Sequence, residues 1–487
     1  MNTEFIKCTI GKLFIILSAL MLVPLCISFL YREGMTHMLS FIIPIVISFT
    51  LGKFLEKRGD NTGDFYLKEA MFIVAMGWIG FSLLGAFPLM LTPMEYPTYI
   101  DALFEMVSGF TTTGASVARS VEILPHSIIF WRSMSHLIGG MGILVFTLAI
   151  LPKTNRHSSL IMQAEVPGPT FGKITSKLSD TARVLYTIYL IMTLITMILL
   201  LFGGMDLFDA SIYAMSTAAT GGFGNRDISI GFYDSRYIEI VLSVAMVAFG
   251  VNFNVYYYSI YRSVKEGADS EELRWYLAIV VISTLLIFLN IRTMYDDTSY
   301  TFSNSLFAVA SVMTTTGFVS ADFGTWPLFS RLILILLMFI GGCAGSTAGG
   351  LKVSRIIILV KRSFNQIRES QNPKRITINR LDSKKLDEDT EASVSKYFSL
   401  YVLLFMIFLF IVALDVDDFQ TAFTTVATTI NNVGPGIGEF GPIANFAAIG
   451  NLSKVALIFA MFIGRLEIFP ILLLFTPSTY KNLRGKI

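Results

Sequence analysis

The chain has 487 residues, of which 54% are hydrophobic and only 15% are charged, and its net charge is +2. A soluble protein of this length needs far more charge on its surface, so the composition predicts an all-α polytopic membrane protein. The small net charge gives no support to nucleic-acid binding. Three scattered cysteines and four histidines show neither a disulfide framework nor metal-ligand spacing, and we expect neither an enzyme nor an organic cofactor on this chain.

Ten segments qualify or nearly qualify as transmembrane helices, which need roughly 20 mostly apolar residues. In chain order they are 10–31, 38–55, 65–91, 128–152, 184–205, 238–261, 275–291, 328–361, 397–415 and 455–475. The first is too long for a signal-peptide core and no small-residue cleavage pattern follows it, so we expect a retained helix. The eighth is too long for one unbroken span.

Basic residues predict the orientation of these spans, because cytoplasmic connections carry an excess of Lys and Arg. An N-terminus on the inside makes the connections 153–183 and 361–396 cytoplasmic, with five and nine basic residues respectively. We therefore expect both termini to be cytoplasmic. The segment 362–396 has the composition of a solvated linker, and its charge pattern leaves open whether it also docks a cytoplasmic partner.

Four connections between the spans share one pattern, a short semi-polar helical stretch that ends at a glycine. Their central runs are GFTTTGAS, AATGGFGN, MTTTGFVS and INNVGPG. Each stretch begins with a residue that caps helix N-termini well, namely Asp101, Asp206, Ser303 and Asp417. The glycines align as Gly114, Gly221, Gly317 and Gly434. This recurrence indicates an internal repeat of helix, half-helix with loop, and helix.

Two full spans per repeat return the chain to the same side, so all four loops enter from the outside as parallel repeats. Irregular backbone at membrane depth is tolerated only where it is buried in protein or lines a water-filled cavity. One TTTG run alone is typical of close helix packing, but four copies favour a central pore whose carbonyl oxygens replace the hydration shell of a cation. The predicted filter residues are Thr112, Thr113, Gly114, Ala219, Thr220, Gly221, Thr315, Thr316, Gly317, Asn432, Val433 and Gly434.

The eighth span contains IGGCAGSTAGGLK, whose glycines disfavour a helix by up to about 1 kcal/mol each. The phosphate-binding pattern GxxxxGK[ST] fails here, because Leu351 follows Gly350 and neither Ser nor Thr follows Lys352. A kink that only packs is one interpretation. We favour a non-helical gate beneath the filter, formed by Gly341, Gly342, Gly345, Ser346, Gly349 and Gly350.

Arg465 lies near the middle of the last predicted span, where an arginine costs at least about 2.5–3.5 kcal/mol. A structural charge partner, such as Glu105, is one explanation. We favour a role in which Arg465 holds the glycine-rich gate and places a positive barrier in the cation path. Asn252 and Asn254 are expected to form interhelical hydrogen bonds.

At TTTGAS (111–116), ATGGFG (219–224), TTTGF (314–318), NNVGPG (431–436) and GGCAGSTAGGLKVSR (341–355), the chain resembles the TrkH-type branch of the Trk/Ktr/HKT potassium transporter superfamily. The resemblance covers essentially the whole chain. It implies two extra N-terminal helices within 1–60, followed by pore repeats at 65–152, 184–262, 275–361 and 397–476 around the 362–396 linker.

The resemblance further implies a bacterial inner-membrane protein that conducts K⁺ through a filter with one glycine per repeat. It implies a homodimer with one pore per chain and a cytoplasmic nucleotide-binding regulatory ring as partner. The second and fourth loops depart from the threonine pattern of the other two, so we expect moderate selectivity. An ion-coupled secondary transporter of another cation or small solute remains the alternative.

Overall fold

The computed structural model describes residues 2–60, 66–92, 95–142, 178–372, 378–382 and 384–477. These residues form a bundle of helices with one small pair of strands, β1 (Arg380–Leu381) and β2 (Lys384–Lys385), which run antiparallel. The predicted connection 153–183 lies mostly outside the described residues, as do the end of the predicted span 128–152 and part of the 362–396 linker.

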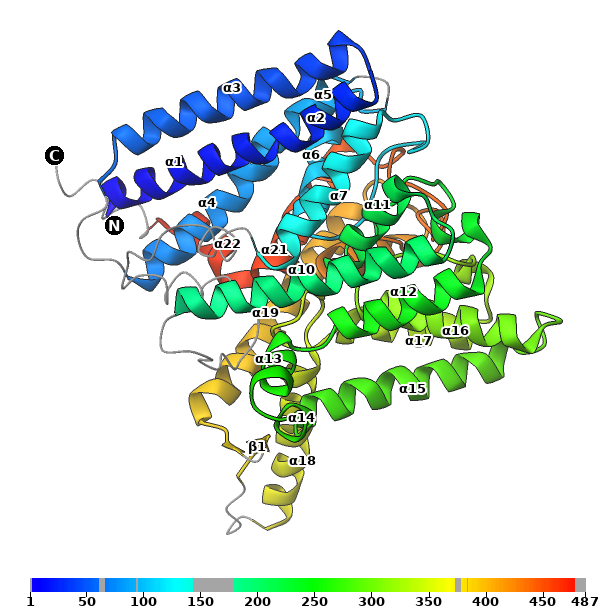
Figure 1. The fold of residues 1–487 in the computed structure, drawn as a ribbon. Coiled ribbons are helices and arrows are strands. Elements are labelled where there is room, and N and C mark those ends of the chain that lie inside the picture. Colours follow the sequence, from blue (N-terminus) through cyan, green and yellow to red (C-terminus); the bar gives the residue numbers. More distant parts are fainter. Residues whose placement is uncertain are drawn as a thin grey trace.

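The first two spans form an antiparallel pair at one edge of the bundle (Figure 1). Helices α1 (Thr3–Leu20) and α2 (Leu22–Leu30) continue one another and pack against α3 (Met35–Lys57). A Cβ added to Gly11 would lie 2.6 Å from the Gly52 carbonyl oxygen. These small residues therefore let the two backbones approach closely.

The remaining helices fall into four groups, each with a short helix between longer ones. The first two groups contain α4 (Leu67–Gly85), α5 (Phe87–Met90), α6 (Tyr99–Phe110) and α7 (His126–Gly140), then α10 (Leu178–Phe202), α11 (Leu207–Ala218), η1 (Ser229–Tyr233), α12 (Arg236–Phe249), α13 (Phe253–Tyr261) and α14 (Val264–Ala268). The last two contain α15 (Glu271–Ile291), α16 (Thr298–Met313), η2 (Phe323–Thr325), α17 (Leu328–Ile340) and α18 (Val353–Gln371), then α19 (Glu388–Val412), α20 (Phe419–Ile430), α21 (Asn451–Leu466) and α22 (Ile468–Phe475).

The described residues contain fewer continuous spans than the ten predicted from hydropathy. Among the described residues, six helices are long and apolar enough to cross a membrane, or seven if the bent pair α12–α13 counts as one span. The predicted break in the eighth span is confirmed, because α17 ends at Ile340 and α18 begins at Val353. Two further spans predicted as continuous are broken. The α12–α13 pair bends by 88°, and Glu467, at a positive φ of 64°, separates α21 from α22.

Four short helices, α6, α11, α16 and α20, make a closed cycle of contacts. Besides neighbours in its own group, α6 packs against α21, α11 against α7, α16 against α12, and α20 against α17. Each short helix therefore touches the preceding group, and the first touches the last. This arrangement surrounds one axis with four repeats, as the predicted fold class requires.

Helix-capping side chains start these four helices, although the predicted caps are only partly correct. Thr98, Asp206, Asp297 and Asp418 are the N-caps. Asp206 is confirmed, but Asp101 is the third residue of α6 and completes a capping box with Thr98. The hydroxyl and backbone N–H of Thr421 donate to the carboxylate of Asp418, which holds its pKa below its usual value.

Candidate functional site

All four short helices end with the same backbone motif. The N–H groups of Thr113, Gly221, Thr316 and Val433 each donate to a carbonyl five residues earlier at 2.8 Å. The residues just before them, Thr112, Thr220, Thr315 and Asn432, have φ between 52° and 58°. This is the Schellman ending, in which one left-handed residue reverses the chain after a helix. It turns each backbone away from its helix at the same position.

The structure corrects the predicted alignment of the second loop by one residue. Two positions after each left-handed residue comes a glycine of positive φ, and these glycines are Gly114, Gly222, Gly317 and Gly434. Gly222 therefore replaces Gly221, which is equivalent to Thr113, and Ala219 is equivalent to Thr111. The prediction matched the dipeptide Thr-Gly, but the second loop has glycine at two consecutive positions. We call the segments 112–114, 220–222, 315–317 and 432–434 the loop ring.

The loop ring closes on itself through contacts between glycines and carbonyl groups. A Cβ added to Gly114 would lie 2.1 Å from the oxygen of Gly221, and one added to Gly222 would lie 2.1 Å from that of Thr316. A Cβ added to Gly317 would lie 2.1 Å from the oxygen of Val433, and one added to Gly434 would lie 2.7 Å from that of Thr113. Each glycine is thus pressed against the next loop in chain order, and no side chain fits there.

Side-chain hydrogen bonds make the four quarters of the ring unequal. Thr111 Oγ1 donates to the Val107 carbonyl at 2.7 Å and lies 2.7 Å from Thr113 Oγ1. Thr314 and Thr316 repeat this arrangement. In the fourth loop, Asn432 Nδ2 instead donates to Thr113 Oγ1 at 2.9 Å and so links the last loop to the first.

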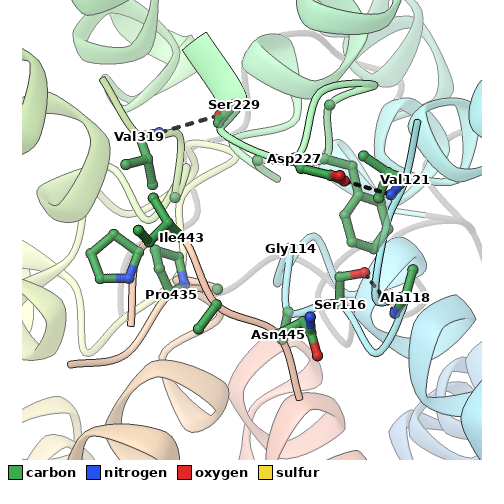
Figure 2. A pocket seen from close by; sticks show the side chains of 18 of the residues that line it. Gly114, Ser116, Ala118, Val121, Asp227, Ser229, Val319, Pro435, Ile443 and Asn445 are labelled. Atoms are coloured by element: carbon green, nitrogen blue, oxygen red, sulfur yellow. Dashed lines mark hydrogen bonds between the residues drawn. The ribbon is translucent and has the colours of Figure 1, made fainter. Parts of the chain in front are cut away.

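A cavity of about 120 Å³ lies against one side of the loop ring, and we call it the mouth cavity. All four ring glycines line it, together with residues that follow them in each loop. Figure 2 shows these segments around the cavity, including Asp227 of the second loop beside Val121 of the first. The Val121 N–H donates to Asp227 Oδ1 at 2.6 Å, which joins the two loops outside the ring.

The segment between α17 and α18, Gly341–Lys352, is non-helical and touches the loop ring; we call it the glycine loop. The Gly349 N–H donates to Thr315 Oγ1 at 2.6 Å, and the Gly350 N–H donates to the Asn431 carbonyl at 3.1 Å. Gly341, Gly345 and Gly350 have positive φ. The loop is therefore held directly against the third and fourth quarters of the ring.

Two further glycine-loop residues that were singled out in the sequence are hydrogen-bonded within this region. Ser346 Oγ donates to the Cys343 carbonyl at 2.6 Å. The Gly342 carbonyl accepts from the Val353 N–H at 3.0 Å, at the start of α18. All six predicted residues thus belong to one compact segment.

Arg465 lies in the last turn of α21 and joins three segments. Its Nη1 donates to the Thr347 carbonyl at 2.6 Å, and its Nη2 donates to the carbonyls of Gly139, at 2.7 Å, and Gly140. The suggested charge partner Glu105 is wrong, because that carboxylate pairs with Arg132 at 2.7 Å.

Sequence reasoning missed two supports of the glycine loop. The Gly250 carbonyl, at the break between α12 and α13, accepts from the Cys343 N–H at 2.9 Å. Asn252 accepts from the Asn254 N–H and so caps α13 rather than joining two helices. Glu272 Oε1 accepts from the N–H groups of Ala344, at 2.8 Å, and Ser354, at 3.0 Å. Gly250 and Asn252, a helix stop followed two residues later by a helix start, were the available signal for the break.

Comparison with known proteins identifies the family of this chain. Residues 35–482 match the TrkH family, described as cation transport proteins. The chain belongs to the TrkH family. A Trk system potassium uptake protein TrkH from Salmonella typhimurium is 35% identical to it, over 99% of this chain and 100% of the relative.

Other TrkH-family proteins are similar over comparable lengths. The TrkG protein of Escherichia coli, also named a Trk system potassium uptake protein, is 34% identical over 99% of this chain. An uncharacterized cation transporter of Methanocaldococcus jannaschii is 32% identical over 99% of it. The crystal structure of the potassium transporter TrkH from Vibrio parahaemolyticus matches with a TM-score of 0.88 at 30% identity, covering 99% of this chain and 100% of that one. The chain is therefore a polytopic membrane transport protein with the TrkH fold.

Proposed function

We propose that this chain takes up K⁺ through a pore whose selectivity filter is the loop ring. The observation that carries the proposal is the closed cycle in which each ring glycine meets the carbonyl of the next loop. Closely spaced backbone carbonyls of four loops offer the ligands that replace the hydration shell of an alkali cation. The names of the TrkH and TrkG relatives support K⁺ as that cation.

The proposed filter follows the corrected alignment, and K⁺ is its cargo rather than a resident cofactor. The second loop contributes Thr220, Gly221 and Gly222, so Ala219 drops out of the predicted set. The other loops contribute the predicted residues Thr112 to Gly114, Thr315 to Gly317 and Asn432 to Gly434. The short helices also direct their partly negative C-terminal ends at the ring, which favours a cation.

The glycine loop and Arg465 form the proposed gate. The Gly349 N–H contact with Thr315 of the ring and the Gly350 N–H contact with Asn431, just before the fourth ring segment, support a position that blocks the path on one side. Arg465 supplies a positive charge next to it and donates to Thr347 of the loop. Movement of this loop away from the ring opens the path.

The setting of the pore follows from the same proposal. The mouth cavity faces the outside of a bacterial inner membrane, and both termini lie in the cytoplasm. The protein works as a homodimer with one pore per chain, and a cytoplasmic nucleotide-binding ring controls the gate. The family's transport role supports the membrane location, and the distribution of basic residues supports the orientation of the termini.

Ion flux into liposomes that contain the purified protein tests the proposal. We expect uptake of K⁺ and Rb⁺ to exceed uptake of Na⁺, and an organic cation of similar charge to remain outside. Flux of an organic solute at the expense of K⁺ would support the secondary-transporter alternative instead. A cytoplasmic nucleotide-binding ring protein, added with and without nucleotide, is expected to change the flux.

A further inference from the structure

Glu105, a fully buried carboxylate on α6, holds the outward segment of the first loop. It accepts hydrogen bonds from Ser116 Oγ at 2.9 Å and from the Val117 N–H at 2.8 Å. These residues follow Gly114 of the loop ring by two and three positions. The carboxylate therefore fixes the chain just as it leaves the ring.

Arg132, on the neighbouring helix α7, supplies the counter-charge and is only 1% exposed. Its Nε donates to Glu105 Oε1 at 2.8 Å, and its Nη2 lies 2.7 Å from the same oxygen. Removal of one partner from such a buried pair is costly, because the other charge is then left without compensation. The ion pair therefore fixes the position of the Arg132 guanidinium, and with it the other contacts that this group makes.

Arg132 also contacts the second loop. Its guanidinium carbon lies 4.1 Å from the centre of the Phe223 ring, and its Nη1 is 3.4 Å from the Gly224 carbonyl oxygen. Phe223 directly follows Gly222 of the loop ring. His136, one turn further along α7, stacks on the same ring at 4.2 Å. Arg132 and His136 of α7 thus both contact Phe223 of the second loop, while Arg132 also pairs with Glu105, which binds the first loop.

Three residues after their ring glycines, the third and fourth loops are instead held by neutral side chains of α16 and α20. In the third, Ser320 Oγ donates to Asn304 Oδ1 at 2.7 Å. In the fourth, the Thr424 hydroxyl bonds both the N–H and the carbonyl of Ile437, at 3.0 and 2.9 Å. The spacing between the first two quarters is therefore controlled by a device different from those of the other two.

We propose that Arg132 is a positioning residue for selectivity, which sets the distance between the first two filter loops. The inference rests on the proposed filter. Discrimination among alkali cations depends on how the carbonyl ligands are spaced and how freely they move. Loss of the Arg132 contacts lets the carbonyls of Thr113 and Gly221 shift apart. The filter then no longer holds the spacing that suits K⁺, and it rejects Na⁺ less strongly.

The test compares K⁺ and Na⁺ flux through variants of the full-length protein in liposomes. Arg132→Met is expected to lower the K⁺-to-Na⁺ flux ratio by at least about fivefold, which corresponds to about 1 kcal/mol. The double variant Arg132→Met with Glu105→Gln leaves no unpaired buried charge. It should fold better and still show the lowered ratio. Phe223→Leu, which keeps the ion pair, is expected to lower the ratio by a smaller factor.

Lys454→Met is the matched control. Lys454 forms another buried ion pair on α6, with Asp101 at 2.7 Å. Asp101 lies in the first turn of α6, at the end of the helix opposite the ring. We expect this variant to be destabilised but to keep the wild-type flux ratio. The inference is overturned if the double variant and Phe223→Leu keep the wild-type ratio, or if Lys454→Met lowers it as much. A wild-type protein without preference for K⁺ overturns the proposed filter itself, which the wild-type arm shows before any variant is compared.

Discussion

Each ring glycine meets two separate demands, a positive φ and a close approach of the next loop. Gly222 has φ 84°, and a Cβ there would lie 2.1 Å from the Thr316 carbonyl oxygen. Gly204 has a similar φ of 89°, but nothing lies within 4 Å of an added Cβ. Substitutions at these two glycines therefore separate the cost of a strained backbone from the cost of a steric clash with the next loop.

Gly222→Ala is expected to reduce K⁺ flux at least about tenfold, since any backbone shift of about 1 Å at a site of this precision is costly. Gly204→Ala carries only the strain of a left-handed residue, about 1–2 kcal/mol. We expect it to lower the unfolding temperature slightly and to conduct normally. Liposome flux and thermal unfolding of both variants provide the measurement, and equal losses of flux would contradict the assignment of Gly222 to the ring.

Arg465 combines a positive charge with several hydrogen bonds to backbone carbonyls. Arg465→Ala removes both and is expected to raise flux measured without the regulatory partner, because the glycine loop loses its attachment through Thr347. Arg465→Lys keeps the charge but offers no planar fork of donors. Its effect on flux therefore distinguishes attachment of the glycine loop from electrostatic repulsion of the cation. Arg331→Ala, on α17, is the control arginine outside the proposed gate. Unchanged flux in Arg465→Ala would refute the gating role.

At the scale of elements, two breaks in the helices, after α17 and between α12 and α13, supply hydrogen-bond partners for each other. The glycine loop follows the break after α17, and the break between α12 and α13 supplies backbone partners for it. The Phe253 N–H donates to the Gly345 carbonyl at 3.1 Å, and Thr347 Oγ1 donates to the Phe249 carbonyl at 3.2 Å. Irregular backbone thus finds its hydrogen bonds in a second irregular segment, as burial within a membrane protein requires.

Glu272, near the start of α15, offers a test of this support. Glu272→Ala leaves the N–H groups of Ala344 and Ser354 without their acceptor, at a cost of about 1–3 kcal/mol for each buried group. We expect a lower unfolding temperature and a raised unregulated flux. Glu272→Gln retains an acceptor oxygen, so its unfolding temperature and its unregulated flux should both lie closer to those of the wild type.

The adjacent Glu271 is the matched control. It pairs with Lys361 at 2.6 Å and is partly exposed. Because ion pairs near the surface contribute little, typically about 0–1 kcal/mol, Glu271→Ala should leave the unfolding temperature and the flux close to wild type. An equal effect of the two alanine variants would show that the glycine loop does not depend on Glu272.

At the scale of the whole molecule, the four repeats close into a cycle because the last contacts the first. Part of that closure is the buried pair between Asp101 on α6 and Lys454 on α21, with side-chain exposures of 7% and 6%. Lys454 Nζ also donates to the Ala447 carbonyl at 3.1 Å. The antiparallel pair formed by α1 and α3 lies outside this cycle (Figure 1).

Lys454→Met is expected to lower stability by about 3–5 kcal/mol, the usual cost of leaving one buried charge unpaired. Lys454→Met combined with Asp101→Asn removes both charges and should recover most of the loss. Thermal unfolding of the detergent-purified protein measures both. A double variant no more stable than the single one would show that the ion pair is not what closes the cycle.

The sequence by itself determined the class, the four repeats and most of the ring residues. Apolar length and the recurring Thr-Gly runs are local features, and they need no knowledge of neighbouring segments. The glycine-rich break after α17 was predicted in the same way, since five glycines disfavour a helix wherever they lie. Arg465 was singled out because an arginine in an apolar segment needs partners, and the structure supplies them as the backbone carbonyls of Thr347 and Gly139.

Only the tertiary structure decided the alignment of the second loop, the breaks at Gly250 and Glu467, and the partners of the buried charges. Two consecutive glycines in the second loop made its alignment ambiguous until the neighbouring carbonyls were placed. The partner of Glu105 lies on another helix, at Arg132, and that of Asp101 lies on α21, 353 residues away at Lys454. Such pairings depend on how repeats pack around an axis, which hydropathy and local motifs do not encode.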